Sequence, residues 1–201
     1  MHHGKHYRRL NRTSSHRQAL LRNLVSSLIE HGRIETTIAK AKTIQPIAEA
    51  MITLGKKGDA EAKKKAIAFL NSRDITLPKL FDEYAKRFAN RQGGYTRIQR
   101  IGSRTGDKAP MAVIEYIDGP TDLKKETVTN VLARAFRDRT TATGSSSSSI
   151  PSVKQLLENE KAIEELGLPK KVIRDLKKVQ FSNSVAIIDK VIQEKMANLK
   201  V

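Results

Sequence analysis

The residues best suited to do chemistry in this sequence are cations near its N-terminus. The first 29 residues contain Lys5, Arg8, Arg9, Arg12, Arg17 and Arg22 and not one Asp or Glu. Arginine and lysine form charge-assisted hydrogen bonds with phosphate oxygens, and no carboxylate of this stretch competes for them. The pattern predicts a basic N-terminal arm that binds a polyanion. The other interpretation is a solvated basic terminus without a specific partner.

Polar residues that follow the arm could add donors for the same anion. They are Thr13, Ser14, Ser15 and His16. A helix that starts here would offer its first backbone amides and the positive end of its dipole to a phosphate. A catalytic nucleophile is disfavoured, because neighbours at a helix start do not face one another and no nearby carboxylate could orient the imidazole. We therefore predict phosphate contacts for these four residues.

A second group of cations surrounds two expected strands. Its members are Lys86, Arg87, Arg91, Arg97, Arg100, Arg104 and Lys108, and Asp107 is the one acid within their span. Tyr95 lies inside the group, where an aromatic ring could stack on an unpaired base. We consider two interpretations, a basic hairpin that tracks a nucleic-acid backbone, or a core tyrosine beside an exposed strand face.

The charge of the whole chain indicates the same class of partner. The sequence has 38 Lys and Arg against 21 Asp and Glu, a net charge of +17. Residues 1–115 carry +13 of this charge and residues 116–201 carry +4. Neutralising phosphates releases condensed counterions and gives affinity without sequence readout, so nucleic acid or an anionic membrane is the expected partner. No apolar run approaches the roughly 18 residues that span a bilayer, and we expect no stable membrane insertion.

The sequence predicts neither a cofactor nor a metal. It has no Cys, which excludes disulfides and thiolate ligands, and it lacks Walker A, dinucleotide-binding and His-Glu-x-x-His motifs. His3 with the terminal amine is only a weak candidate for binding copper or nickel. Acidic residues are scattered, with no evident pair for acid–base work. We expect no enzyme activity and no small-molecule substrate.

Hydrophobic spacing and turn residues predict the elements that position these side chains. Ser15 and Gln18 form a capping-box pattern, and Gly32 can end the helix that follows. Pro46 should kink or restart the second helix near Gln45. The predicted elements are a helix over 15–31, a strand over 33–37, helices over 38–54 and 60–71, a helix with Pro78 in its first turn, a strand over 95–101 with a bulge or frayed end, and a strand over 111–117.

The C-terminal part has a different composition. A linker is expected over 118–150, because it contains mixed charges and then five consecutive serines. Helical spacing returns at 153–166 and 184–199, and Gly167, Leu168 and Pro169 open a short helix between them. The predicted organisation is a basic arm over 1–14, a core domain over 15–117, the linker over 118–150 and an α-helical extension over 151–201.

Several blocks of the sequence resemble one known family in collinear order. They are RTSSHRQALLRNL at 12–24, IEHGRIETT at 29–37, AKAK at 39–42, LFDE at 80–83, RQGGYTRI at 91–98 and APMA at 109–112. This pattern is similar to that of the bacterial-type large-subunit ribosomal protein seventeen family over about residues 1–117. The resemblance implies an α+β fold, a two-layer domain with a helix, a strand, three helices and two strands in order. The helical spacing beyond it adds a mainly α-helical C-terminal extension.

The resemblance also implies a function. Members of this family are structural constituents of the large ribosomal subunit, bind its rRNA near the polypeptide exit and have no catalytic role. The predicted RNA-contacting residues are Lys5, Arg8, Arg9, Arg12, Thr13, Ser14, Ser15, His16, Arg17, Arg22, Arg91, Tyr95, Arg97, Arg100, Arg104 and Lys108. The alternative function is that of a free RNA- or DNA-binding regulatory protein.

Two features depart from the short bacterial form. The opening residues 1–7 are less rich in arginine, and the 84 residues of 118–201 have no counterpart. Such an extension resembles mitochondrial, particularly fungal, members of the family, whose added segments contact neighbouring ribosomal proteins or RNA. We therefore expect the mitochondrial matrix as the location, with the bacterial cytoplasm as the alternative. The acid-free arm also resembles an import signal, so it could serve both purposes.

Overall fold

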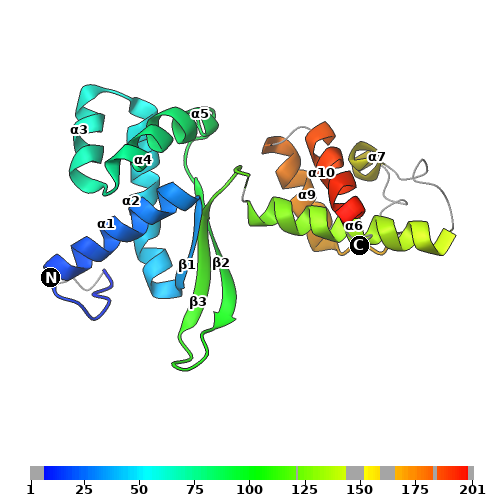
Figure 1. Cartoon of the computed structure of the whole chain (residues 1–201), viewed down its shortest axis with the longest axis horizontal. Helices are drawn as coiled ribbons and strands as arrows, with labels where there is room; N and C mark the ends of the chain where they lie inside the picture. The colour runs from blue at the N-terminus through cyan, green and yellow to red at the C-terminus, as the bar shows by residue number, and fades with distance from the viewer. Residues whose placement is uncertain (1–6, 121, 144–151, 159–165, 183–184, 199–201) are drawn as a thin grey trace. The chain divides into compact units, whose positions relative to one another are not determined.

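The computed structural model describes residues 7–120, 122–143, 152–158, 166–182 and 185–198 (Figure 1). The chain divides into two compact units, Met1–Gly119 and Pro120–Val201. The elements of the first unit are α1 (Ser14–His31), β1 (Arg33–Thr37), α2 (Ile38–Lys57), α3 (Ala60–Phe69), α4 (Arg73–Pro78), the π-helix η1 (Lys79–Tyr84), α5 (Ala85–Arg87), β2 (Thr96–Ser103) and β3 (Pro110–Tyr116). The predicted α+β class is confirmed.

The three strands form one antiparallel sheet in the order β1-β3-β2, with β3 in the centre. The register between β2 and β3 shifts between Arg100 and Gly102, which confirms the predicted bulge. Gly102 has a φ of +131°, a conformation that residues with a Cβ rarely adopt. The bulge therefore sits where the sequence supplies glycine.

The core of the first unit lies between the helices and one face of the sheet. Alternate residues of β3, Ala112, Ile114 and Tyr116, are buried there, as the twofold period of a strand requires. Helices α1 and α2 pack on this face (Figure 1). They contribute the buried side chains Val25, Leu28, Ile29, Ala41, Ile44, Ala48, Met51 and Ile52. The two layers place the start of α1 and the β2–β3 hairpin on a common scaffold.

Helix α1 begins one residue earlier than predicted. Its N-cap is Thr13, in extended conformation, and the Arg17 amide donates to the Thr13 carbonyl oxygen at 2.9 Å. The expected capping box at Ser15 is wrong, because Ser15 already lies in the first turn. At the other end, Gly32 caps the helix with a φ of +76° and donates to the Leu28 carbonyl oxygen, as predicted.

Two prolines lie inside helical segments instead of interrupting or starting them. Helix α2 does not restart at Pro46, since its buried face continues through Ala48 and Met51 on the far side of the proline. Pro78 ends α4 and leads directly into η1, so its expected place in a first turn is wrong. A proline removes one backbone donor, and the π-helix η1 follows Pro78 directly.

Gly55 lies within α2, although the helix was predicted to end at residue 54. A Cβ at this position would meet the Leu80 carbonyl oxygen at 2.9 Å, closer than such contacts occur. Gly58, with a φ of +69°, is the residue that caps α2. Gly55 therefore allows α2 to approach η1.

The second unit is helical where the structure describes it. Its elements are α6 (Leu123–Thr143), α7 (Val153–Glu158), α9 (Lys170–Ser182) and α10 (Val185–Asn198). They surround a separate core that includes Val128, Leu132, Phe136, Leu156, Leu176, Ile188 and Ile192. The serine run and residues 159–165 of the first expected C-terminal helix lie outside the described residues.

Residues 123–143 form a helix where a linker was expected. The Asp122 carboxylate accepts from the backbone amides of Lys124 and Lys125 at 2.8 and 3.2 Å, and so caps the start of α6. The spacing of Val128, Leu132 and Phe136 was the signal for this helix. Its mixed-charge surface residues obscured that spacing.

We predict that Tyr84 makes the first unit sensitive to alkali. Its hydroxyl donates to the Ile29 carbonyl oxygen at 3.0 Å, and burial raises the pKa of Tyr84 to about 12. An unfolded tyrosine ionises near pH 10, so the folded form binds more protons between pH 10 and 12, and stability falls there by about 1.4 kcal/mol per pH unit. Tyr84→Phe should lose about 1 kcal/mol below pH 10 through the missing hydrogen bond, and this deficit should shrink as pH rises.

The measurement is denaturant unfolding from pH 8 to 11.5. Tyr7→Phe is the matched control, because Tyr7 is 53% exposed. A constant difference in stability between wild type and Tyr84→Phe across this range would contradict the assignment.

Candidate nucleic-acid interface

The described part of the N-terminal arm folds back beside the start of α1. Leu10 and Asn11 both have left-handed backbone conformations, with φ values of 56° and 52°. The Arg12 amide donates to the Arg9 carbonyl oxygen at 3.3 Å, and Arg12 Nη1 donates to the Leu10 carbonyl oxygen at 3.0 Å. This turn holds the half-buried Arg12 as a structural part of the arm.

Cations and hydroxyls of the arm are exposed around the N-terminus of α1. The exposed residues there are Arg8, Arg9, Thr13, Ser14, Ser15 and His16. Arg22 is also exposed, but it lies farther along α1, with its guanidinium 5.8 Å from the centre of the Phe69 ring. The first turn of α1 contains no acidic residue, and the first backbone amides of a helix have no partner within it. The arrangement offers donors and positive charge at one place. Lys5 lies outside the described residues.

Tyr7 was missed as a candidate by reasoning from sequence. Its ring is 53% exposed, and the Arg17 guanidinium lies 4.6 Å from the ring centre. Such a stacked pair presents a flat surface of the kind on which nucleic-acid bases stack. The signal was a tyrosine within an acid-free basic stretch, but ten residues separate it from Arg17 and only the turn brings the two together.

Tyr95 is a core residue, so its expected stacking on a base is wrong. It is 5% exposed and its ring packs against Phe88, with centroids 5.1 Å apart. Its hydroxyl donates to the Arg91 carbonyl oxygen at 3.3 Å. Lys56 Nζ lies 5.5 Å from the ring centre and donates to that same carbonyl oxygen. Tyr95 therefore fixes the segment before β2.

Arg87 pairs with Glu83 one helical turn away, and three further arginines of the second cation group are paired with carboxylates of the chain itself. Arg91 Nη1 lies 3.0 Å from Asp118 Oδ2, and Arg97 Nη1 lies 2.9 Å from Glu115 Oε1. Glu115 is 1% exposed, and an unpaired charge at such a site would be costly. Arg97 is thus a structural residue of the sheet, in contrast to the free phosphate-binding role that the sequence suggested.

The third pair lies in the loop between β2 and β3. Arg104 donates to both oxygens of Asp107, at 3.1 and 2.6 Å. The hydrogen bond from Arg104 and the amide of Ala109 lower the pKa of Asp107 to about 2, so this carboxylate stays charged and offsets Arg104. Arg100 and Lys108 are exposed nearby. They form the available positive charge of the hairpin.

The two cation groups lie at separate places on the first unit. Figure 1 shows the start of α1 well away from the tip of the β2–β3 hairpin. The structure therefore brings together the arm and the start of α1, but it does not merge them with the hairpin. A polyanion that touches both would have to be extended or folded around the unit.

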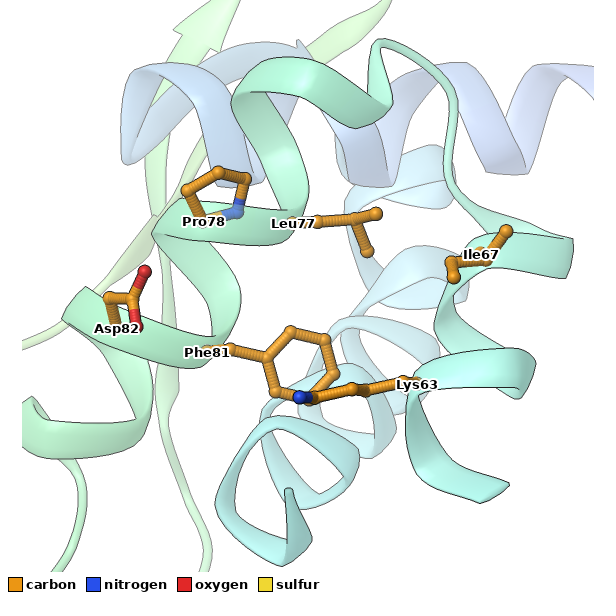
Figure 2. A pocket seen from close by; sticks show the side chains of 6 residues that line it. All are labelled: Lys63, Ile67, Leu77, Pro78, Phe81 and Asp82. Carbon is orange, nitrogen blue, oxygen red and sulfur yellow. The ribbon is translucent and has the colours of Figure 1, made fainter. Parts of the chain in front are cut away.

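A shallow hollow of about 280 Å³ lies between α3 and the α4–η1 segment (Figure 2). Lys63, Ile67, Leu77, Pro78, Phe81 and Asp82 line it. Lys63 Nζ lies 5.8 Å from the centre of the Phe81 ring, whereas Asp82 lies at another end of the hollow (Figure 2). The lining is mainly apolar and its two charged groups do not converge as acid–base chemistry requires.

The described residues contain no group of three or more His, Asp or Glu side chains that could hold a metal ion. Within the same residues, no helix is long and apolar enough to cross a membrane. The exposed cations remain the main chemical feature of the first unit.

The first unit has an α+β fold, with exposed cations at the start of α1 and on the β2–β3 hairpin. The family model described as Ribosomal protein L17 matches residues 20–117. Large ribosomal subunit protein bL17 of Brucella ovis is 52% identical over 125 residues, which is 62% of this chain and 87% of that protein. The bL17 of Ruegeria pomeroyi is 53% identical over 124 residues, 62% of this chain and 88% of its own length. The chain belongs to the ribosomal protein L17 family.

Substitutions of Arg97 and Arg100 should affect different properties. The Arg97 substitution should lower stability, and the Arg100 substitution should weaken RNA binding. Arg97→Ala leaves the buried Glu115 without this partner and should destabilise the first unit by about 2 kcal/mol, somewhat less than for a fully buried pair because Arg97 is partly exposed. Arg100→Ala should change stability by less than about 0.5 kcal/mol. If Arg100 neutralises one phosphate, its loss lowers the log–log salt slope of rRNA binding by about 0.7 to 0.9.

Denaturant unfolding and salt-dependent binding of both variants test this division. Equal stability of Arg97→Ala and wild type would remove the structural role of Arg97. A loss of stability in Arg100→Ala would show that its side chain supports the fold.

Proposed function

We propose that this protein is a structural constituent of the large ribosomal subunit and binds large-subunit rRNA. The observation that carries the proposal is the acid-free opening of 29 residues, whose exposed cations gather at the N-terminus of α1. The relatives that match 62% of the chain are named as proteins of this subunit. Family membership favours this function over that of a free RNA- or DNA-binding regulator.

The arm would bind the RNA backbone through three kinds of donor. Arg8 and Arg9 supply charge, Ser14 and Ser15 supply hydroxyls, and the first turn of α1 supplies amides and a favourable dipole. The ring of Tyr7 adds a surface for an unpaired base. These contacts would position the protein on the RNA without recognising a long base sequence.

The β2–β3 hairpin would supply a second, separate contact. Arg100 and Lys108 are exposed there, and the neighbouring Arg104 is held by Asp107. Because one packed unit carries both the arm and the hairpin, two RNA segments bound to them would be fixed relative to each other. The protein would then act as a clamp on folded rRNA.

The location in the cell is a further part of the proposal. The chain continues for 84 residues beyond position 117, and such an extension resembles those of mitochondrial members of the family. We therefore place the protein in the ribosome of the mitochondrial matrix, where the extension would also contact neighbouring ribosomal proteins. The bacterial cytoplasm is the alternative, and the bacterial relatives favour it.

Gradient sedimentation of full-length tagged protein tests the function and the location together. Organelle and cytoplasmic extracts of the source cells are sedimented separately at moderate and at high salt. The protein should move with the large subunit of the mitochondrial extract and remain with it at moderately high salt. Recovery at the top of every gradient would contradict the ribosomal function, whereas sedimentation with cytoplasmic subunits would contradict only the location.

The double substitution Arg8→Ala and Arg9→Ala should weaken RNA binding without affecting the fold. Both side chains are exposed and precede α1. If each neutralises one phosphate, the log–log salt slope of rRNA binding falls by about 1.4 to 1.8, and incorporation into subunits decreases.

Lys57→Ala with Lys64→Ala is the matched control, because it removes two exposed cations from α2 and α3. This control should keep the slope of the wild type. An equal fall in both double variants would mean that total charge, and not the arm, determines binding.

A further inference from the structure

Helix α9 of the second unit carries five cations on one face. They are Lys170, Lys171, Arg174, Lys177 and Lys178, and all five are exposed. At 100° per residue these positions fall within an arc of about 120°, and they extend over about 12 Å of the helix axis. The stripe is therefore continuous along more than two turns.

The single acid of α9 offsets this stripe only in part, through the charges of Arg174 and Lys178 that act on it. Asp175 is 8% exposed, and its carboxylate lies 2.8 Å from Lys124 Nζ of α6. Burial alone would raise the pKa of Asp175, but the hydrogen bond and charge of Lys124 reverse this effect and lower it. Leu176 and Val179 pack in the core of the unit on the same inner side. The carboxylate thus faces inward and is used by Lys124.

None of the five cations forms an ion pair with a carboxylate of the described residues, although the charges of Arg174 and Lys178 act on the nearby Asp175. Arg174 lies three or four positions from each of the other four, a spacing at which like charges on a helix repel. The exposed surfaces of neighbouring helices mix both signs, as Arg134 and Asp138 do on α6 and Lys190 and Glu194 do on α10. Helix α9 therefore keeps a repulsive stripe that a bound polyanion would relieve.

We propose that the exposed face of α9 is a second RNA-binding surface, formed by Lys170, Lys171, Arg174, Lys177 and Lys178, which contacts the phosphate backbone of an RNA segment. Four of the five residues are lysines, which act as point charges and lack the planar fork of arginine. The surface therefore binds phosphates without reading base sequence. The matched family region ends at residue 117, so this surface belongs to the part of the chain outside it.

An RNA partner fits this face better than a protein partner does. The centre of a protein–protein interface is depleted of charged residues, and lysine is rare there. Here four of the five cations are lysines, which surround the single Arg174 at the centre of the stripe. Counterion release on phosphate contact turns the same charges into affinity.

Lysine footprinting tests the proposal on the full-length wild-type protein. An amine-reactive reagent is applied to the free protein, to its complex with large-subunit rRNA transcript, and to assembled large subunits. The four lysines of α9 should react more slowly in the rRNA complex, whereas the exposed Lys154 and Lys190 of α7 and α10 should keep their reactivity. Protection in assembled subunits but not with rRNA alone would overturn the proposal in favour of a protein partner. Absence of protection in both would overturn it as well.

A triple variant tests the same surface through the salt dependence of RNA affinity. Lys171→Gln, Arg174→Gln and Lys178→Gln should lower the log–log salt slope of binding to the rRNA transcript by about 2 to 3. Between 50 and 200 mM salt the wild type would then lose about 16- to 64-fold more affinity than the variant. The control Arg134→Gln, Lys154→Gln and Lys190→Gln removes the same charge from other helices of the unit and should keep the wild-type slope. An unchanged slope in the α9 variant, or an equal fall in the control, would overturn the proposal.

The inference rests on the proposed function for the identity of the RNA in the cell, and the two can fail separately. If wild type does not sediment with large subunits but its α9 lysines are protected by RNA, the proposed function fails and the α9 surface stands. If wild type sediments with large subunits and the α9 lysines stay reactive in the rRNA complex, only the α9 surface fails.

Discussion

The packing of α1 and α2 on one face of β3 is the constraint on which the first unit depends. Ile114 and Tyr116 of the central strand are buried against these helices. The Tyr116 ring lies 4.7 Å from that of Tyr84, whose hydroxyl donates to the last turn of α1. Because the core fixes both the helix and the sheet, the cations at the start of α1 and those of the hairpin cannot move independently. A rigid spacing between two basic sites is what a clamp on folded RNA needs.

Within that scaffold, cations have two different uses. Arg97 neutralises the buried Glu115, and Arg104 is held by Asp107, so these guanidiniums mainly support the sheet and its loop. Arg8, Arg9 and Arg100 lie at the surface. The composition counts all of these residues equally. Only exposed cations that are not paired with a carboxylate can release counterions from RNA. The cations available to RNA are therefore fewer than the 38 lysines and arginines of the sequence.

Local patterns were sufficient for most of the elements. The alternation and turn residues around 33–37, 95–101 and 111–117 predicted the strands, because residues adjacent in the chain determine the period of a strand. Gly32 ends α1 in the conformation that favours glycine. The restart predicted at Pro46 does not occur, and Pro78 ends α4 instead of lying in the first turn of a helix. At α6 the buried Val128, Leu132 and Phe136 needed partners from other helices to be recognised as a core.

The sequence by itself determined the family, the order of elements and the absence of acids from the arm. Each of these features depends only on residues that follow one another in the chain. Only the tertiary structure decided which side chains of the candidate site are available. Tyr95 is buried under Phe88, and the turn at residues 9–12 leaves Tyr7 exposed beneath Arg17. Glu115 meets Arg97 across two paired strands, 18 positions away in the chain. Burial and ion pairing depend on neighbours in space, and a pattern of nearby residues does not contain them.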